Sequence, residues 1–119
     1  MNWIKNNQSL ITISFGIILI GITFLSLLPP RSTIDLGNND KLSHFFAYSV
    51  LTFNALLIQR FKSFKIWLLL ALNTYGGLME FIQGFVPGRE VSLLDIAANS
   101  SGVFIGFILI QLFKNVDKN

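Results

Sequence analysis

Nine polar residues with chemically capable side chains stand within segments of the sequence that are otherwise apolar. They provide carboxylates, amides, an imidazole, a phenol and two cations: Asp40, Lys41, His44, Tyr48, Glu80, Gln83, Arg89, Asp95 and Asn99. Carboxylates and imidazoles act as general acids and bases, and Lys and Arg side chains bind phosphate groups. Such groups are energetically costly inside a lipid bilayer, which favours a functional interpretation of them.

The composition indicates that a bilayer is the right environment to consider. Of the 119 residues, 52% are hydrophobic and only 13% are charged, and the mean hydropathy is +0.61. A soluble chain of this length has a large surface for its volume and needs many charged residues to cover it. We therefore expect residues 1–119 to form a single membrane domain. The sequence has no Cys, so it offers no thiol nucleophile and no thiolate metal ligand.

Four apolar stretches are long enough to cross a membrane: residues 9–28, 42–59, 66–86 and 93–113. At ~1.5 Å per residue, each would form a helix roughly 27–32 Å long, which matches the hydrocarbon layer. The predicted fold is all-α, a polytopic membrane protein with four transmembrane helices in an antiparallel bundle.

The charged residues predict an orientation. With both termini in the cytoplasm, six basic residues lie inside, namely Lys5, Arg60, Lys62, Lys65, Lys114 and Lys118, and three lie outside, namely Arg31, Lys41 and Arg89. This bias follows the positive-inside rule. All carboxylates except Asp117 then fall in the outward half: Asp35, Asp40, Glu80, Glu90 and Asp95. We expect the chemistry to face outward and no nucleic acid to bind, because no basic stripe with interleaved aromatic residues is present.

The connections carry recognisable turn and cap signals. Residues 29–39 contain Pro-Pro, a Gly and two Asn, so we predict a loop, with Asn39 or Asp40 capping the helix that follows. Pro87-Gly88 predicts a tight turn. Ser92 is the expected N-cap of the last helix.

Helical spacing predicts that the polar residues share faces. Lys41, His44 and Tyr48 are three and four residues apart, as are the members of two further sets, Asn73, Gly76, Glu80 and Gln83, and Ser92, Asp95, Asn99, Gly102 and Gly106. Since buried donors and acceptors in lipid need partners, the last three helices should turn these faces toward one another. Asn54 and Asn73 fall near the bilayer midplane, and a pairing between them there would be a helix–helix contact rather than a site.

Four motifs in this order resemble those of the VanZ-like family of small bacterial membrane proteins. They are DK-x-x-H-x-x-x-Y at 40–48, E-x-x-Q at 80–83, PGR at 87–89 and D-x-x-x-N-x-x-G at 95–102. The resemblance covers about residues 40–106. The first apolar stretch is similar only in being apolar and in its Ser26 and Pro-Pro ending. The resemblance implies a multi-pass protein of the bacterial cytoplasmic membrane. The family is named for an accessory protein of glycopeptide-resistance clusters that gives modest teicoplanin resistance, so a role in the cell envelope is implied.

Each candidate residue also has a structural interpretation. Glu80, about 9 Å below the interface, must be protonated, paired with Arg89 or Lys41, or bathed by water, so we favour a functional role for it. His44 fits either a structural partner of a carboxylate or a proton shuttle. Arg89 fits either an interface anchor or a bidentate phosphate ligand. Four further polar residues have packing or capping explanations: Asp95, Asn99, Gln83 and Ser92.

Three functional classes follow from these residues. The first, which we favour, is a protein whose outward pocket binds a membrane lipid or a lipid-linked envelope precursor; its ligand-binding candidates are Lys41, His44, Tyr48, Glu80, Gln83, Arg89, Asp95 and Asn99. The alternative is an intramembrane enzyme in which Glu80 and His44 act as acid and base on a headgroup. A transporter is disfavoured, because polarity confined to one leaflet provides no path across the bilayer unless the chain forms an oligomer. We expect no metal and no cofactor, because one His with Asp and Glu is a sparse ligand set.

Overall fold

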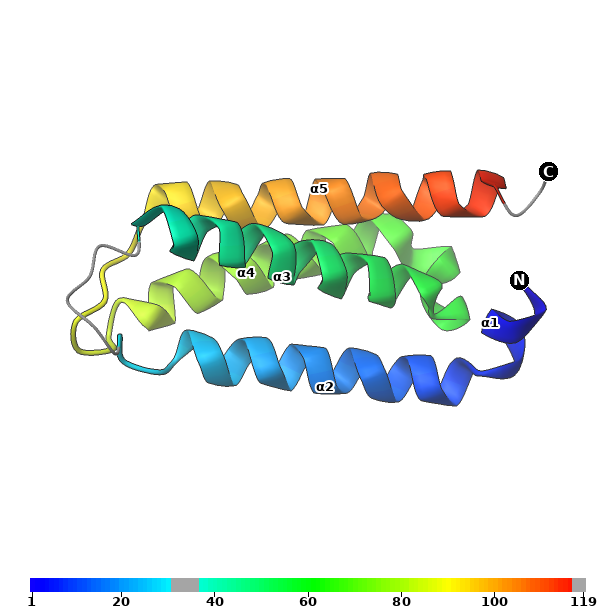
Figure 1. Ribbon diagram of the computed structural model, residues 1–119, viewed down its shortest axis with the longest axis horizontal. Coiled ribbons are helices and arrows are strands. Elements are labelled where there is room, and N and C mark those ends of the chain that lie inside the picture. Colours follow the sequence, from blue (N-terminus) through cyan, green and yellow to red (C-terminus); the bar gives the residue numbers. More distant parts are fainter. Residues whose placement is uncertain (31–36, 117–119) are drawn as a thin grey trace.

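The computed structural model describes residues 1–30 and 37–116, and every element in those residues is helical. In chain order they are α1 (Asn2–Asn6), α2 (Gln8–Ser26), α3 (Gly37–Leu57), the 3-10 helix η1 (Gln59–Phe64), α4 (Lys65–Gln83) and α5 (Leu93–Val116). The four long helices lie side by side with alternating direction, in a body of 49 × 24 × 23 Å (Figure 1). The N-terminus, the C-terminus and η1 share one end, and the connection between α4 and α5 lies at the other.

The α3–α5 pair forms the most extensive helix interface, and two glycines of α5 permit it. A Cβ atom on Gly106 would lie 2.5 Å from the Ser49 carbonyl oxygen, and one on Gly102 would lie 3.0 Å from the Tyr48 Cβ atom. Real Cβ atoms essentially never show the first distance, and the second is tighter than most real Cβ contacts, so a side chain at either glycine would force α3 to shift. Gly102 and Gly106 are four residues apart on one face, the spacing of the GxxxG packing motif.

The apolar core lies beside this interface. Its fully buried members come from three helices: Tyr48, Leu51, Ala55, Leu72 and Val103. Side chains of α2, including Phe15, Ile18, Leu19 and Ile22, pack against the core from the other side. The polar residues of α3, α4 and α5 are thereby held at one end of a rigid three-helix contact.

Large apolar side chains also cover the outside of all four long helices. Among the most exposed are Ile17, Ile20, Phe46, Trp67, Phe81, Phe104 and Leu112. Two helices, α2 and α5, are long and apolar enough to cross a membrane. In α3 and α4, charged and polar residues such as Asp40, Lys41, His44 and Glu80 lower the average hydropathy, so these helices do not meet the same criterion.

The predicted segments correspond to the four long helices, with shifted ends. Residues 9–28 correspond to α2, 66–86 to α4 and 93–113 to α5. α4 stops at Gln83, three residues before the predicted end; a Gly follows it, and Pro87 cannot continue a helix. The short helices α1 and η1 were not predicted.

The predicted cap of the second segment, 42–59, is wrong. α3 begins at Gly37, before both Asn39 and Asp40, so neither residue is its N-cap. Asp40 instead lies in the first helical turn, where a carboxylate is also stabilised by the helix dipole. The charged residues Arg31, Asp35, Asp117 and Lys118, and most of the predicted 29–39 loop, lie outside the described residues.

Asn54 and Asn73 do not form the helix–helix pair considered for them. The Asn54 side-chain nitrogen donates to the Ser14 hydroxyl oxygen on α2 at 2.8 Å. The Asn73 side-chain nitrogen donates to the Leu69 carbonyl oxygen one turn back in α4, at 2.9 Å. Each side-chain nitrogen therefore donates to a residue other than the second Asn.

Candidate functional site

The polar residues of α3, α4 and α5 meet at the end of the bundle opposite the termini. We call the set Asp40, Lys41, His44, Tyr48, Glu80, Gln83, Arg89, Asp95 and Asn99 the polar seam. Tyr48, Glu80, Gln83, Asp95 and Asn99 are buried, each with at most 6% of its surface exposed. The seam is thus a set of interior polar groups rather than a hydrated surface.

His44 links α3 to both neighbouring helices through Asn99. Its Nδ1 atom lies 2.8 Å from the Asn99 Oδ1 atom, and the Asn99 side-chain nitrogen donates to the Gly76 carbonyl oxygen of α4 at 3.3 Å. Gly76 is needed at this point, because a Cβ there would lie 3.0 Å from the Tyr48 ring and 3.2 Å from the Asn99 Cβ. The contact with Gly76 orients the amide so that its oxygen faces His44, which makes Nδ1 the donor.

Glu80 connects α4 to the start of α5. Its Oε1 atom accepts a hydrogen bond from the Ser92 backbone nitrogen at 2.8 Å. The Ser92 hydroxyl in turn accepts one from the Asp95 backbone nitrogen at 3.3 Å, so the prediction that Ser92 caps the last helix is confirmed. Glu80 therefore holds Ser92, the residue that caps the N-terminus of α5.

Arg89 lies over the rim of the seam on a tight turn. Gly88 has φ +82°, and the Arg89 backbone nitrogen donates to the Val86 carbonyl oxygen at 3.1 Å, a turn with Pro87 and Gly88 at its centre. The Arg89 Nε atom donates to the Leu28 carbonyl oxygen at 2.8 Å. Its Nη1 atom lies 3.9 Å from the Asp40 Oδ1 atom. Arg89 thus pairs with Asp40, and Glu80 takes a backbone donor instead.

Asp40 is the member that sequence reasoning placed in the wrong role. Treated above as a cap, it lies between Arg89 and the Nε2 atom of His44, which is 3.7 Å from its Oδ1 atom. The i,i+4 spacing of Asp40 and His44 on one helix was the available signal for this pair. Asp40, His44 and Arg89 together form the partly exposed rim of the seam.

Below that rim, three buried oxygen atoms have no hydrogen-bond partner among the described residues. They are the Tyr48 hydroxyl, Glu80 Oε2 and Asp95 Oδ1. An unsatisfied buried polar group costs about 1–3 kcal/mol, and buried polar atoms in folded proteins are normally paired. The described part of the seam is consequently not a closed hydrogen-bond network, and its remaining acceptors are available to a ligand, a proton or water.

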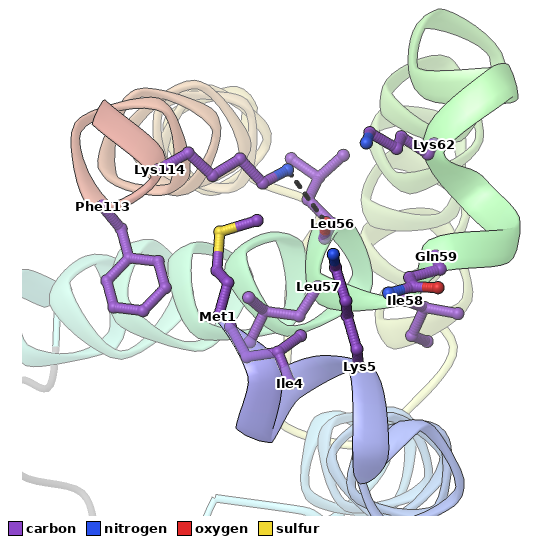
Figure 2. Close-up of a pocket in the computed structure, with 10 residues that line it drawn as sticks. All are labelled: Met1, Ile4, Lys5, Leu56, Leu57, Ile58, Gln59, Lys62, Phe113 and Lys114. Carbon is purple, nitrogen blue, oxygen red and sulfur yellow. Dashed lines mark hydrogen bonds between the residues drawn. The ribbon is translucent and has the colours of Figure 1, made fainter. Parts of the chain in front are cut away.

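The opposite end of the bundle carries a different pocket (Figure 2). Apolar residues of α1, α3 and α5 line it together with three lysines, Lys5, Lys62 and Lys114. The Lys114 amino group donates to the Leu56 carbonyl oxygen at 3.4 Å. This end is basic, whereas the seam is rich in carboxylates.

The comparisons with known proteins agree with the sequence motifs. The chain is 30% identical over 103 residues to an uncharacterized protein, C11E3.10, of the fission yeast Schizosaccharomyces pombe; the match covers 83% of this chain and 61% of the yeast protein. The chain thus spans less than two thirds of that relative's length. No solved structure matches the chain. The family described as VanZ/LLP1 matches residues 5–114, and this protein therefore belongs to the VanZ/LLP1 family.

Proposed function

We propose that this chain is a four-span membrane protein whose polar seam faces outward and binds the phosphate-bearing headgroup of a membrane lipid or lipid-linked envelope precursor. The observation that carries the proposal is the set of unpartnered buried oxygens of Tyr48, Glu80 and Asp95 beneath a partly exposed rim. A seam that served only to hold helices together would gain stability by pairing these atoms. Leaving them unpaired suits a site whose partner is a bound molecule.

The surface of the molecule supports the membrane part of the proposal. All four long helices expose large apolar side chains, and the basic residues Lys5, Lys62 and Lys114 surround the pocket at the end that carries both termini. By the positive-inside rule, that end is cytoplasmic and the seam lies in the outer leaflet. In bacteria the membrane would be the cytoplasmic membrane.

The position of Arg89 supports a phosphate ligand. Its guanidinium is held over the rim by the Leu28 carbonyl, and a guanidinium matches the geometry of phosphate oxygens. Lys41, in the N-terminal part of α3, supplies a second cation at the end of the bundle that carries Arg89. Because a similar chain occurs in fission yeast, the proposed chemistry is the phosphate that ordinary phospholipids share with isoprenoid-linked precursors.

Native mass spectrometry of the protein, purified in a phosphate-free maltoside detergent, tests this proposal. The wild type is expected to retain a phosphate lipid that the Arg89→Ala variant loses. The Glu90→Gln variant, which alters an exposed neighbouring residue, is expected to retain it. Equal retention by all three proteins would mean that the seam only holds the helices together. The Arg89→Lys variant keeps the positive charge but loses the paired N–H donors of the guanidinium, so intermediate retention of the lipid is expected.

An intramembrane enzyme is the second candidate function. One observation favours it. The buried Glu80 Oε2 atom has no hydrogen-bond partner among the described residues, and the Glu80 carboxylate interacts electrostatically with His44, the one imidazole of the seam. Glu80 and His44 would then act as base and acid on a bound headgroup, which requires water to reach them. Incubating the protein with a retained lipid distinguishes the two functions: turnover in the wild type, absent in Glu80→Gln and in His44→Gln, identifies an enzyme.

A role in glycopeptide tolerance is the physiological part of the proposal. A lipid-linked precursor held at the outer leaflet would be less accessible to teicoplanin. Expression in a susceptible bacterial host is expected to raise the teicoplanin concentration that stops growth, and Arg89→Ala is expected to abolish the rise. An equal rise with both proteins would separate the phenotype from the seam.

A further inference from the structure

Three side chains of metal-binding types, two carboxylates and one imidazole, face one another at and just below the rim of the seam. Asp40 and His44 lie one turn apart on α3, and Asp95 lies in the first turn of α5. One ligand atom from each residue lies within 4.8 Å of the other two. The close α3–α5 packing at Gly102 and Gly106 holds the two helices in this register. Helical spacing predicted that the helix faces carrying His44 and Asp95 would meet, but no metal was expected among them.

His44 has the orientation of a metal ligand. Its Nδ1 atom donates to Asn99 Oδ1, so the neutral imidazole carries its lone pair on Nε2, the atom that faces Asp40. Metal-bound histidines usually donate the other ring N–H to a fixed acceptor, as this one does. The 3.7 Å between Nε2 and Asp40 Oδ1 is too long for a hydrogen bond. It is close to the ~3.4 Å that separates two ligands about 2.1 Å from one tetrahedral ion.

Two buried oxygen atoms give independent support. Asp95 is 6% exposed and Glu80 is 1% exposed; within residues 1–30 and 37–116, neither Asp95 Oδ1 nor Glu80 Oε2 has a hydrogen-bond partner. Glu80 also interacts electrostatically with Asp95, His44 and Asp40, so it lies within the same field. Buried charges of one sign need a cation or a proton to offset them.

The cations already present do not balance these carboxylates. Arg89 approaches Asp40 at 3.9 Å, and Lys41 interacts with Asp95. With His44 neutral, as a metal ligand must be, two cations thus face three carboxylates: Asp40, Glu80 and Asp95. A divalent ion would make the cluster net positive and would also suit it to a phosphate oxygen.

We propose that Asp40, His44 and Asp95 bind a divalent first-row transition-metal ion, such as Zn²⁺ or Mn²⁺. One imidazole nitrogen with carboxylate oxygens and no thiolate is a ligand set for such ions, and Mg²⁺ and Ca²⁺ prefer oxygen ligands alone. The site does not require the lipid proposed above, since its three ligands come from the chain itself.

Metal binding by the full chain in detergent, without added lipid, tests the site. After treatment with a chelator, the protein is titrated with Zn²⁺ and with Mn²⁺, and bound metal is measured by mass spectrometry and by competition with a chromophoric chelator. One ion per chain is expected. His44→Gln and Asp95→Asn are expected to bind at least tenfold more weakly, and Glu90→Gln to bind like the wild type.

A second pair of variants keeps the three ligands and alters only Asn99, the hydrogen-bond acceptor of the His44 Nδ1–H group. Asn99→Leu removes the acceptor of the Nδ1–H group and is expected to weaken metal binding 10–100-fold. Asn99→Asp keeps an acceptor and is expected to bind within a few-fold of the wild type. Circular dichroism and size-exclusion chromatography confirm that each variant is folded.

Two results would overturn the site. In one, folded His44→Gln and Asp95→Asn bind the ion as tightly as the wild type does, which would place the metal elsewhere. In the other, no ion binds, and Asp40 and Asp95, which lie within hydrogen-bonding reach of each other, share a proton instead. Because lipid is absent from this experiment, neither result bears on headgroup binding.

Discussion

The Nδ1 atom of His44 lies 2.8 Å from the Oδ1 atom of Asn99, across the interface of α3 and α5. The same amide donates to the Gly76 carbonyl oxygen of α4, so one side chain connects the three helices that form the seam. This relationship sets which face His44 presents to Asp40 and Asp95. The chemistry of the rim therefore depends on a residue beneath it.

The tautomer of His44 is a direct consequence of that contact. We predict that the metal-free protein at neutral or higher pH carries the imidazole proton on Nδ1. The chain contains a single His, so nitrogen-15 NMR of histidine-labelled protein gives one pair of ring signals to read. Asn99→Leu is expected to shift the proton toward Nε2. A wild-type ring protonated on Nε2 would contradict the arrangement.

Replacing Gly106 with Ala is expected to destabilise the protein by about 1–3 kcal/mol, because the new Cβ would overlap the Ser49 carbonyl oxygen of α3. Thermal unfolding followed by circular dichroism measures the loss. Gly77→Ala is the matched control, since nothing lies within 4 Å of a Cβ there and Ala favours helix. Equal unfolding temperatures for the two variants would show that α3 and α5 are not in close contact at Gly106.

Substitutions separate two roles of the Glu80 side chain: accepting the Ser92 hydrogen bond and carrying a carboxylate. Glu80→Ala leaves the Ser92 N–H without its acceptor and is expected to cost about 1–3 kcal/mol. Glu80→Gln keeps a carbonyl oxygen for Ser92 and is expected to cost less. Chemical denaturation in detergent measures both, with Glu90→Ala as the control. If Glu80→Ala were as stable as Glu90→Ala, the Glu80–Ser92 contact would not contribute to folding.

The proposed orientation is open to direct labelling, because the chain has no native Cys. Single-cysteine variants at two exposed positions, Glu90→Cys and Ser63→Cys, report on opposite ends of the bundle. In intact cells, a membrane-impermeant maleimide is expected to label the first and to label the second only after permeabilisation. The reverse pattern would place the seam in the cytoplasmic leaflet.

Helical spacing predicted which polar residues share a face, because 3.6-residue periodicity follows from backbone geometry alone. It therefore identified His44, Glu80 and Asn99 as members of one interior set. It did not predict the partner of each side chain, which depends on how far one helix is shifted along its neighbour. In this chain that shift is set by the contacts of Gly102 and Gly106 with α3.

The loops account for the other differences. Asp40 has a side chain that favours both a cap and a first helical turn, and the start of α3 at Gly37 distinguishes the two roles. The Arg89 contact with the Leu28 carbonyl joins segments 61 residues apart, and no local pattern encodes it. Cap and turn signals that act within four residues, those of Ser92 and Pro87-Gly88, were predicted correctly.

The most direct test of the central claim, that the seam is a binding site, follows the His44 ring while a phosphate lipid is added. Protein labelled uniformly with nitrogen-15, in maltoside micelles, is titrated with phosphatidic acid and observed by nitrogen-15 NMR, which reports both the His44 ring and the backbone amides. A saturable shift of the His44 signals is expected, lost in Arg89→Ala and kept in Glu90→Gln. Unchanged His44 signals, with backbone shifts confined to residues near Lys5, Lys62 and Lys114, would contradict it and assign lipid binding to the basic pocket of Figure 2.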